Sequence, residues 1–312
     1  MRLVALAAML AVGVPSPVAG ACAPARPGPD APLALVLSGG GAKGAYEAGV
    51  AAALIKAGTP IRLVTGSSAG ALNAAMIADG RLDRMEALWR TITRDQVYAL
   101  RPSVIFGGLL PGWLTLLTLD RAGSLFDARP LRELVAASVD LGRVRASPLR
   151  VLVVATDLER REKRIFDNGS LTIDALMAAA AVPGAFPPVE VNGDLLVDGG
   201  ITGRAPVLEA LESGLPVDRA LVVLSYGAGE RGARPDTMRR VLEEAFEMAM
   251  IHQIRRDAEL ARLRYPAVDV QLLTPSAPLL LRPLDFEPAG LSRALELGLA
   301  DGEGCARTWR GH

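Results

Sequence analysis

The sequence has little histidine or cysteine and no excess of charge of either sign. Its 312 residues include two histidines, His252 and His312, and two cysteines, Cys22 and Cys305. These numbers exclude a metal site of several histidines, a multi-cysteine zinc site and a disulfide-rich scaffold. Basic and acidic residues are equal at 34 each. The composition therefore gives no support for nucleic-acid binding, which relies on a basic surface.

Apolar residues, by contrast, are abundant. They make up 50% of the chain, charged residues 22% and aromatic residues 4%. This composition excludes a disordered chain and allows a large buried core. The length fits one large α/β domain or two smaller domains, and no linker is evident after residue 33.

Residues 1–21 have the pattern of an export signal. Arg2 precedes an apolar stretch of 12 residues, Leu3 to Val14, and small residues follow at positions 19–21. The stretch is too short to span a bilayer, which needs about 20 apolar residues. We therefore expect a protein exported to the bacterial periplasm or envelope. The alternative is a buried first helix.

Cleavage after Ala21 would place Cys22 at the new N-terminus. The run 18–22 resembles a bacterial lipobox, although Ala19 stands where leucine is usual. The sequence slightly favours lipidation of Cys22, and without a lipid the protein would be secreted. A disulfide between Cys22 and Cys305, or two free thiols, are the alternatives. Four prolines make residues 22–32 a stiff linker, which we place outside the fold.

The order of apolar runs and turns predicts an α/β fold. Continuous apolar runs such as Leu33 to Leu37 are typical of strands buried on both faces of a parallel sheet. Strand, turn and helix alternate, which favours a mostly parallel sheet. The expected strands are 33–37, 61–65, 149–155, 195–197, 220–225 and 267–273. The expected helices are 45–57, 69–79, 237–264 and one near 291–299.

The first motif with chemical meaning is a glycine-rich turn after the first strand. It reads Gly39-Gly40-Gly41-Ala42-Lys43-Gly44 and opens a helix. Glycine lets the backbone turn sharply and expose successive N–H groups beside a helix N-terminus, which suits an anion. The turn also matches the dinucleotide fingerprint, but residues 58–68 contain no acidic residue for the ribose. A purely structural turn is the remaining alternative.

The second motif follows the strand 61–65. It reads Gly66-Ser67-Ser68-Ala69-Gly70 and fits a nucleophile elbow. An elbow holds its central serine in a strained backbone conformation, so its neighbours must be small. Ser68 would then stand at the carboxyl end of the strand, facing the N-terminus of the next helix. The alternative is a turn in which Ser68 only caps that helix.

The third motif, Asp198-Gly199-Gly200, supplies a base for the serine. Alone it would be an ordinary turn, but serine needs a partner that takes its proton. His312 is the last residue, and His252 has the spacing of a helix surface. A Ser-His-Asp triad is therefore disfavoured, and a pair of Ser68 and Asp198 remains.

Together these motifs resemble the patatin-like phospholipase family. The resemblance is good over residues 33–210 and looser beyond. Connecting stretches also look alike, namely Ser124-Leu125-Phe126-Asp127, Ala155-Thr156-Asp157-Leu158 and the run 182–189. One departure is the run 201–206, where Gly203-Arg204 stands in place of the family's usual Asn residues before Pro206.

The resemblance implies a three-layer α/β/α fold, related to α/β-hydrolases, over residues 33–312. It implies hydrolysis of lipid acyl esters without calcium or another cofactor. Ser68 would be the nucleophile and Asp198 would accept its proton. N–H groups of Gly39–Gly41 would bind the oxyanion, and Lys43 would help to fix the loop. The expected partner is a membrane lipid or another ester, with peripheral membrane contact and no nucleic acid.

Three questions stay open from the sequence. The apolar segment Leu109 to Leu119, with Trp113, could be a lid or acyl-chain wall, although ordinary core packing is favoured. A catalytically silent lipid-binding envelope protein is the main alternative function, and a nucleotide-binding oxidoreductase is a weaker one. The acyl substrate and the oligomeric state cannot be derived from these residues.

Overall fold

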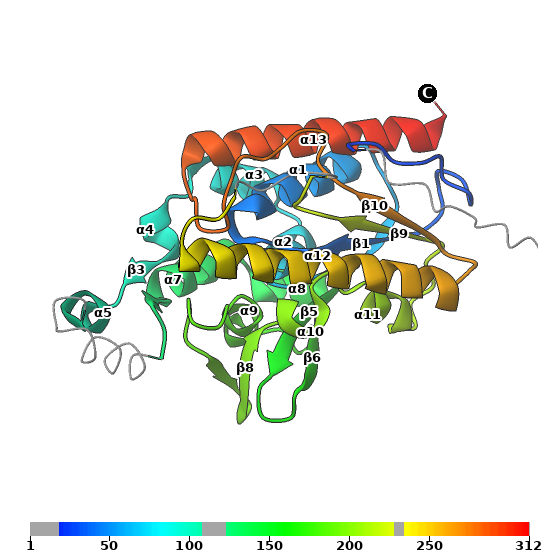
Figure 1. Cartoon of the computed structure of the whole chain (residues 1–312). Helices are drawn as coiled ribbons and strands as arrows, with labels where there is room; N and C mark the ends of the chain where they lie inside the picture. The colour runs from blue at the N-terminus through cyan, green and yellow to red at the C-terminus, as the bar shows by residue number, and fades with distance from the viewer. Residues whose placement is uncertain (1–18, 108–122, 228–233, 312) are drawn as a thin grey trace, which may run out of the picture.

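Alternating side chains of the first strand face two separate cores. The computed structural model describes residues 19–107, 123–227 and 234–311 (Figure 1). In β1 (Leu33–Leu37), Leu33, Leu35 and Leu37 pack on one side of the sheet. Ala34 and Val36 pack on the other. All five side chains are buried, so the strand lies inside the molecule, as its continuous apolar run predicted.

The central sheet has eight strands in the order β10-β9-β1-β2-β5-β8-β7, with β6 also paired to β5. The pairs from β10 to β5 are parallel, whereas β6, β7 and β8 pair antiparallel. The other strand bounds are β2 (Ile61–Gly66), β5 (Arg150–Asp157), β6 (Glu162–Asp167), β7 (Val189–Val191), β8 (Asp194–Asp198), β9 (Arg219–Val223) and β10 (Asp269–Leu273). A separate antiparallel pair consists of β3 (Ala99–Leu100) and β4 (Phe126–Asp127).

Helices cover both faces of the sheet and complete three layers (Figure 1). One face carries α1 (Gly44–Lys56), α2 (Ala69–Asp79), α3 (Leu82–Thr91), α7 (Arg129–Ser138), α8 (Leu141–Ala146), α9 (Ile173–Ala179) and α13 (Pro288–Arg310). The other face carries α11 (Val207–Glu212) and α12 (Met238–Arg264). The short helices are α4 (Arg94–Val97), α5 (Pro102–Gly107), α10 (Gly200–Gly203) and a 3-10 turn over Gly41–Lys43. The expected α/β/α architecture is confirmed.

Helix ends follow local sequence signals. Gly80 adopts a left-handed conformation with φ 79° and ends α2, and Gly311 ends α13 in the same way with φ 77°. Thr237 begins α12 by accepting a hydrogen bond from the N–H of Arg240. The helix expected near 291–299 is longer than predicted, because Pro288 begins α13 and only Gly311 stops it.

Helices α1 and α13 pack with their backbones in close contact. A Cβ atom at Gly298 would lie 2.1 Å from the carbonyl oxygen of Tyr46, and one at Gly49 would lie 2.2 Å from that of Leu295. The Tyr46 hydroxyl donates to Asp301 at 2.9 Å. Glycine at these positions allows the close approach, since any side chain would overlap the partner backbone.

Residues 22–32 contain no helix or strand but belong to the folded body. The Arg219 side chain is buried and donates hydrogen bonds to the carbonyl oxygens of Pro29 and Ala31. The Trp309 indole N–H donates to Ala23 at 3.2 Å. The expectation that this segment lies outside the fold was wrong, because its backbone carbonyls are the acceptors for a buried cation.

Cys22 and Cys305 form a disulfide between the N-terminal segment and α13. The predicted lipidation of Cys22 is therefore wrong in this structure, because its sulfur is already bonded to another sulfur. Most of the predicted export signal, residues 1–18, lies outside the described residues. Among the helices that the structure describes, none is long and apolar enough to cross a membrane.

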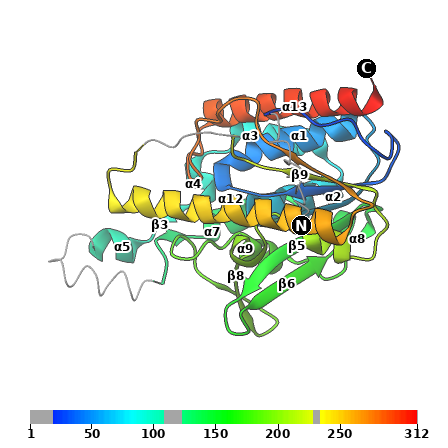
Figure 2. The ribbon, with the colours of Figure 1, turned by 45° about the vertical axis from the view of Figure 1, so that its right-hand side comes forward.

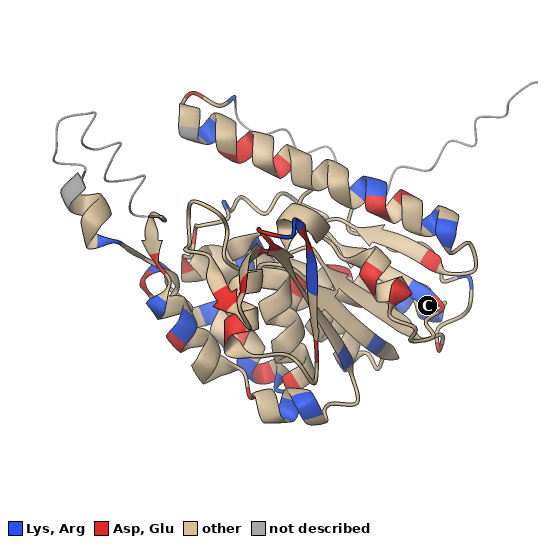
Figure 3. Ribbon diagram, turned by 90° about the horizontal axis from the view of Figure 1, so that it is seen from below, with Lys and Arg blue, Asp and Glu red and all other residues tan. Residues whose placement is uncertain are grey.

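Charged residues of both signs are interspersed over the ribbon seen from below, including along α12 (Figure 3). Several of them pair, as Arg264 does with Glu212 at 2.8 Å between α12 and α11. This mixture agrees with the balanced composition and gives that face no single sign of charge.

Candidate active site

Strand β5 brings together the turns that hold Ser68 and Asp198, which lie 130 positions apart in the sequence. Strand β6 pairs with residues 152–157 along one edge of β5. Both β2 and β8 must therefore use the other edge, where Gly66 pairs with Val153 and Asp198 with Ala155. Two residues span about 7 Å along a strand. The end of β2 and the end of β8 consequently meet, which brings the serine turn and the aspartate turn together.

Ser68 occupies a strained turn between β2 and α2. Its backbone has φ 54° and ψ −135°, a conformation that non-glycine residues rarely adopt. A Cβ atom at Gly66 would lie 2.4 Å from the carbonyl carbon of Gly70, and one at Gly70 would lie 2.6 Å from the oxygen of Leu37. The turn therefore closes only with glycine at both positions, as the elbow motif predicted.

The carbonyl oxygen of Ala179 joins the two turns directly. It accepts the N–H of Ser68 at 2.8 Å and the N–H of Gly199 at 3.4 Å. The two donor nitrogens are thus at most about 6 Å apart, by the sum of these distances. Gly199 also fits closely, because a Cβ atom there would lie 2.0 Å from the oxygen of Val154. The structure brings residues 68 and 198 into one site.

The Asp198 carboxyl has one oxygen engaged and one without a partner. Oδ1 accepts the N–H of Gly200 at 2.7 Å. Oδ2 is buried and makes no hydrogen bond of normal geometry with the described residues. Burial raises the pKa of Asp198, and the Arg204 guanidinium, the Gly200 N–H and the Ser68 hydroxyl act in the opposite direction. The carboxyl therefore has a free, basic oxygen close to the serine.

Three consecutive glycines form the loop above this pair. Gly39, Gly40 and Gly41 all have positive φ values of 72°, 124° and 60°. The N–H of Gly39 is not available to a ligand, because it donates to the buried Glu47 carboxyl at 2.9 Å. The N–H groups of Gly40 and Gly41 make no hydrogen bond to another described residue. Of the three predicted oxyanion donors, two are therefore open.

Glu47 holds the loop from inside the molecule. Its carboxyl also accepts the N–H and the hydroxyl of Ser38, at 2.8 and 2.7 Å. Burial raises the pKa of Glu47 to about 8, although these hydrogen bonds and Arg204 oppose the shift. Ser225 fixes the other side of the loop by donating to the Gly39 carbonyl at 2.6 Å.

Lys43 ties the loop to α12. Its ammonium pairs with Glu247 at 2.8 Å and lies 4.5 Å from the centre of the Tyr226 ring. The N–H of Ala42 donates to the Pro283 carbonyl at 2.9 Å. Gly44 begins α1 beside Ala69. Lys43 and Ala42 thus connect the glycine loop to α12 and to the segment that contains Pro283.

Arg204 lies between the aspartate turn and the glycine loop. Its side chain is buried and donates to the Tyr226 hydroxyl at 3.2 Å, while its backbone carbonyl accepts the Ser67 hydroxyl at 2.7 Å. Nη2 lies 3.3 Å from the point where a Cβ atom at Gly40 would stand. The residue that departs from the family pattern is thus part of the site.

Ser68 opens into a large apolar cavity of about 940 Å³. This is near the upper end of the about 300–1,000 Å³ usual for ligand sites. Gly40, Gly41, Arg204 and Tyr226 line it beside Ser68. Its apolar lining comes mainly from α2, α3, α7 and α12, with Leu72, Met76, Leu88, Trp89, Leu131, Leu134, Val135, Phe186 and Met250 among the residues. Figure 2 shows the N-terminal end of α12 on the same side of the molecule as α4, α5 and β3.

The other residues that the sequence singled out do not line this cavity or lie outside the described residues. His252 is on the exposed side of α12 and does not line the cavity, and His312 is not described. The predicted lid segment 109–119 also lies outside the described residues, although Ile105 and Leu125 on either side of it line the cavity. Within the described ranges, no three His, Cys, Asp or Glu residues are grouped to hold a metal ion.

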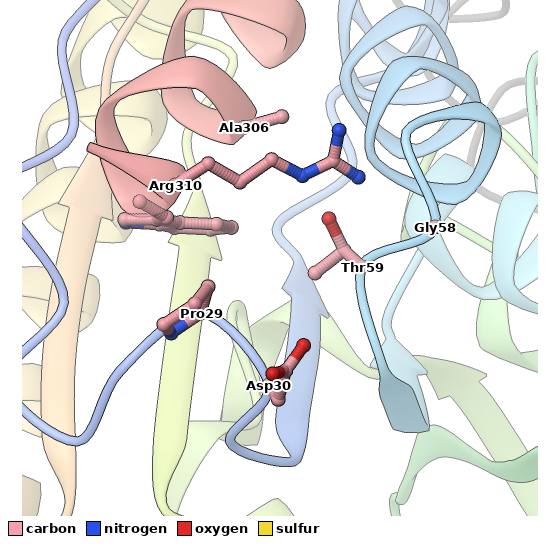
Figure 4. Close-up of a pocket in the computed structure, with 7 residues that line it drawn as sticks. Pro29, Asp30, Gly58, Thr59, Ala306 and Arg310 are labelled. Atoms are coloured by element: carbon pink, nitrogen blue, oxygen red, sulfur yellow. The ribbon is translucent and has the colours of Figure 1, made fainter. Parts of the chain in front are cut away.

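A second, smaller cavity lies at the opposite ends of the parallel strands. Pro29, Asp30, Gly58, Thr59 and Arg310 are among its lining residues, and its volume is about 230 Å³ (Figure 4). It is formed by the N-terminal segment, the turn before β2 and the end of α13. None of the residues of the three motifs reaches it.

Sequence reasoning missed Glu47, Arg204, Tyr226 and the Ala179 carbonyl. Glu47 had a signal, since it is a lone acidic residue in the apolar helix that follows the glycine loop. Arg204 was visible as a departure from the family pattern. Tyr226 and Ala179 had no signal in the sequence, because only the fold brings them to the site.

Fold and site place the chain among the three-layer α/β/α proteins that carry a G-x-S-x-G elbow at the end of a parallel strand. Within this class, the model of the patatin-like phospholipase family matches residues 35–211, which is more than half of the chain. The chain therefore belongs to the patatin-like phospholipase family.

Two curated relatives and one solved structure are similar to parts of this chain. An uncharacterized NTE family protein of Mycobacterium tuberculosis is 33% identical over 213 residues, covering 68% of this chain and 54% of the relative. Patatin-like phospholipase domain-containing protein 7 of Mus musculus is 27% identical over 202 residues, covering 64% and 14%. VipD from Legionella pneumophila has a TM-score of 0.45 at 16% identity, covering 91% of this chain and 67% of VipD. The chain spans about half the length of the mycobacterial relative.

Proposed function

We propose that the protein hydrolyses acyl esters of lipids through Ser68 and Asp198. The observation that carries this proposal is the free Oδ2 of Asp198, buried beside a strained serine that opens into an apolar cavity. The cavity suits an acyl chain, and the buried carboxyl has the raised pKa that a general base needs. Family membership supports the same substrate class.

In the first step, the Ser68 hydroxyl attacks the ester carbonyl and Asp198 takes its proton. The developing oxyanion would be bound by the N–H groups of Gly40 and Gly41, which have positive φ values and no protein acceptor among the described residues. The tetrahedral intermediate then collapses, the Asp198 proton passes to the departing alcohol, and an acyl-serine remains. Each such donor is typically worth about 10²–10³ in rate.

In the second step, water replaces the alcohol. Asp198 takes a proton from the water, whose hydroxyl attacks the acyl-serine, and the same loop binds the second oxyanion. Collapse releases the fatty acid and returns the proton to Ser68. The sum is ester plus water giving acid plus alcohol, and no metal or cofactor takes part in these steps.

Serine-reactive fluorophosphonate labelling and turnover of p-nitrophenyl esters test this proposal. We expect Ser68→Ala to abolish labelling, and Ser68→Ala and Asp198→Asn each to lower turnover by at least about 10³-fold. Ser213→Ala, at the half-buried C-terminal end of α11 and outside the large cavity, is the matched control and should keep wild-type labelling and turnover. Circular dichroism checks the fold of each variant. Undiminished turnover by Ser68→Ala would refute the proposal, and an unlabelled wild type would favour a silent lipid-binding protein.

We also propose that the protein works outside the cytosol. Disulfides persist mainly in oxidising compartments, and Cys22 and Cys305 are joined. The export pattern of residues 1–21 supports the same location. Cell fractionation of a C-terminally tagged chain tests it. Recovery of the full-length chain in the cytosol, with both thiols free, would contradict it.

A further inference from the structure

Arg204 is a buried cation that touches both halves of the site without forming an ion pair there. Its guanidinium donates to the Tyr226 hydroxyl through Nη2, and its Nε has no hydrogen-bond partner. Its backbone is held in turn by the Ser67 hydroxyl, next to the nucleophile. Buried arginine is normally paired, so this arrangement needs a reason.

The position of Nη1 relative to Asp198 supplies that reason. Nη1 lies 3.1 Å, and Asp198 Oδ1 3.0 Å, from the point where a Cβ atom at Gly200 would stand. The two atoms are therefore at most about 6 Å apart by the sum of these distances. Arg204 and Asp198 nevertheless form no direct hydrogen bond or ion pair.

At this distance, the positive charge of Arg204 stabilises the ionised carboxyl of Asp198 without hydrogen-bonding to its oxygens. An opposite charge within about 4–6 Å lowers a carboxyl pKa by roughly 1–3 units. A direct ion pair would engage the oxygens of Asp198 and weaken it as a base. At the observed separation, Oδ1 keeps its bond from Gly200 and Oδ2 stays free for the serine proton.

Few other charged or titratable groups face this pair, and Lys43, whose ammonium lies over the Tyr226 ring, is paired with Glu247. Asp198 is influenced by Arg204, the Gly200 N–H and the Ser68 hydroxyl. Arg204 is influenced by Tyr226, Asp198 and Glu47. Arg204 is thus the one cation among the groups that influence Asp198, and it offsets part of the pKa increase that burial imposes on this carboxyl.

We propose that Arg204 is a positioning residue for catalysis, whose offset guanidinium keeps Asp198 ionised and ready to accept the Ser68 proton. This inference rests on the proposed function and adds to it. It also gives the departure at Gly203-Arg204 a role, because a neutral residue at position 204 could not supply the charge.

The test is the pH dependence of kcat/KM for a soluble p-nitrophenyl ester. Arg204→Gln removes the charge and keeps a shorter polar side chain, whereas Arg204→Lys keeps a charge. Without the charge, we expect the acidic midpoint to rise by about 1–2 pH units. One unit below the wild-type midpoint, the rate of Arg204→Gln should therefore fall by about 10- to 100-fold. It should recover to within a few fold at high pH, and Arg204→Lys should keep a midpoint closer to wild type.

A purely structural role gives a different result. An equal loss at every pH, or the same midpoint in the Gln and Lys variants, would overturn the inference. If Arg204→Gln does not fold, Tyr226→Phe replaces it. This change removes the hydrogen bond that holds the guanidinium at its offset position, so the midpoint should move, and an unmoved midpoint would count against the inference. If wild-type turnover does not depend on Ser68 at any pH, the proposed function itself fails, which is a separate outcome.

Discussion

The disulfide between Cys22 and Cys305 offers the most direct test of how the N-terminal segment is attached. It closes a loop with a sequence separation of 283 residues. The loop-closure relation gives about 5–6 kcal/mol of stabilisation for such a length, and removing a native disulfide typically costs about 2–5 kcal/mol. We expect the lower part of this range, because Arg219 still holds Pro29 and Ala31 after the bond is broken.

The perturbation is Cys22→Ser together with Cys305→Ser, and the assay is thermal unfolding. For a chain of this size, about 3 kcal/mol corresponds to a decrease in Tm of roughly 5 °C. A reducing agent should lower the Tm of the wild type to that of the double variant and leave the variant unchanged. Ester turnover below the transition should stay the same, because neither cysteine lines the large cavity.

Two results would refute this reasoning. A double variant as stable as the wild type would mean that the bond adds nothing to the contacts of Arg219 and Trp309. Intact-mass measurement of a lipid on Cys22 in the exported protein would show that the bond does not form.

Two further predictions concern packing and pH. Gly298→Ala should lower the free energy of unfolding in urea by about 1–3 kcal/mol, because its Cβ atom would lie 2.1 Å from the Tyr46 carbonyl oxygen. Gly304→Ala in the same helix is the control. Its Cβ atom would meet nothing closer than 3.9 Å, so it should not lower the free energy of unfolding. Glu47→Gln imitates a protonated carboxyl. The raised pKa of about 8 means that the stability contributed by Glu47 is present at low pH and lost as pH rises from about 5 to 8, by at most about 1.4 kcal/mol per unit. Urea unfolding at pH 5.5 and 8 measures this loss. The free energy of unfolding should decrease less between the two pH values for Glu47→Gln than for wild type, and equal decreases would contradict the raised pKa of Glu47.

Much of the parallel half of the fold could be predicted from the sequence. Strand 33–37 is apolar and buried throughout, and strand 61–66 is buried from Leu63 onward, with Arg62 and Thr65 as its polar residues. The antiparallel half was harder. Strand β6 (Glu162–Asp167) has only Phe166 buried among its six residues, so its sequence resembles a polar loop. Strand β7 has only three residues and no periodic pattern to detect.

The site was predictable where a local backbone demand restricts the residue type. Gly66 is required by a contact within the turn, Gly70 by the nearby carbonyl of Leu37, and the glycines of the loop by positive φ values. Both motifs could therefore be recognised in the sequence. Glu47 contacts Ser38 and Gly39, only nine and eight positions away, and its place as the lone acidic residue of an apolar helix was the available signal. Arg204 acts through contacts with Ser67 and Tyr226, which are distant in the sequence. Its importance depends on which elements lie next to it, and a single sequence does not contain that information.

The alignment of β2 and β8 along one edge of β5 has a consequence for when activity can appear. A nascent or partly unfolded chain in which β8 has not joined the sheet holds its serine and its aspartate on unconnected segments. Under the proposed mechanism, such a chain could not attack lipids while it is being made. Ester turnover would therefore appear only after the central sheet has assembled. The rate at which turnover returns during refolding would measure how fast β8 joins the sheet.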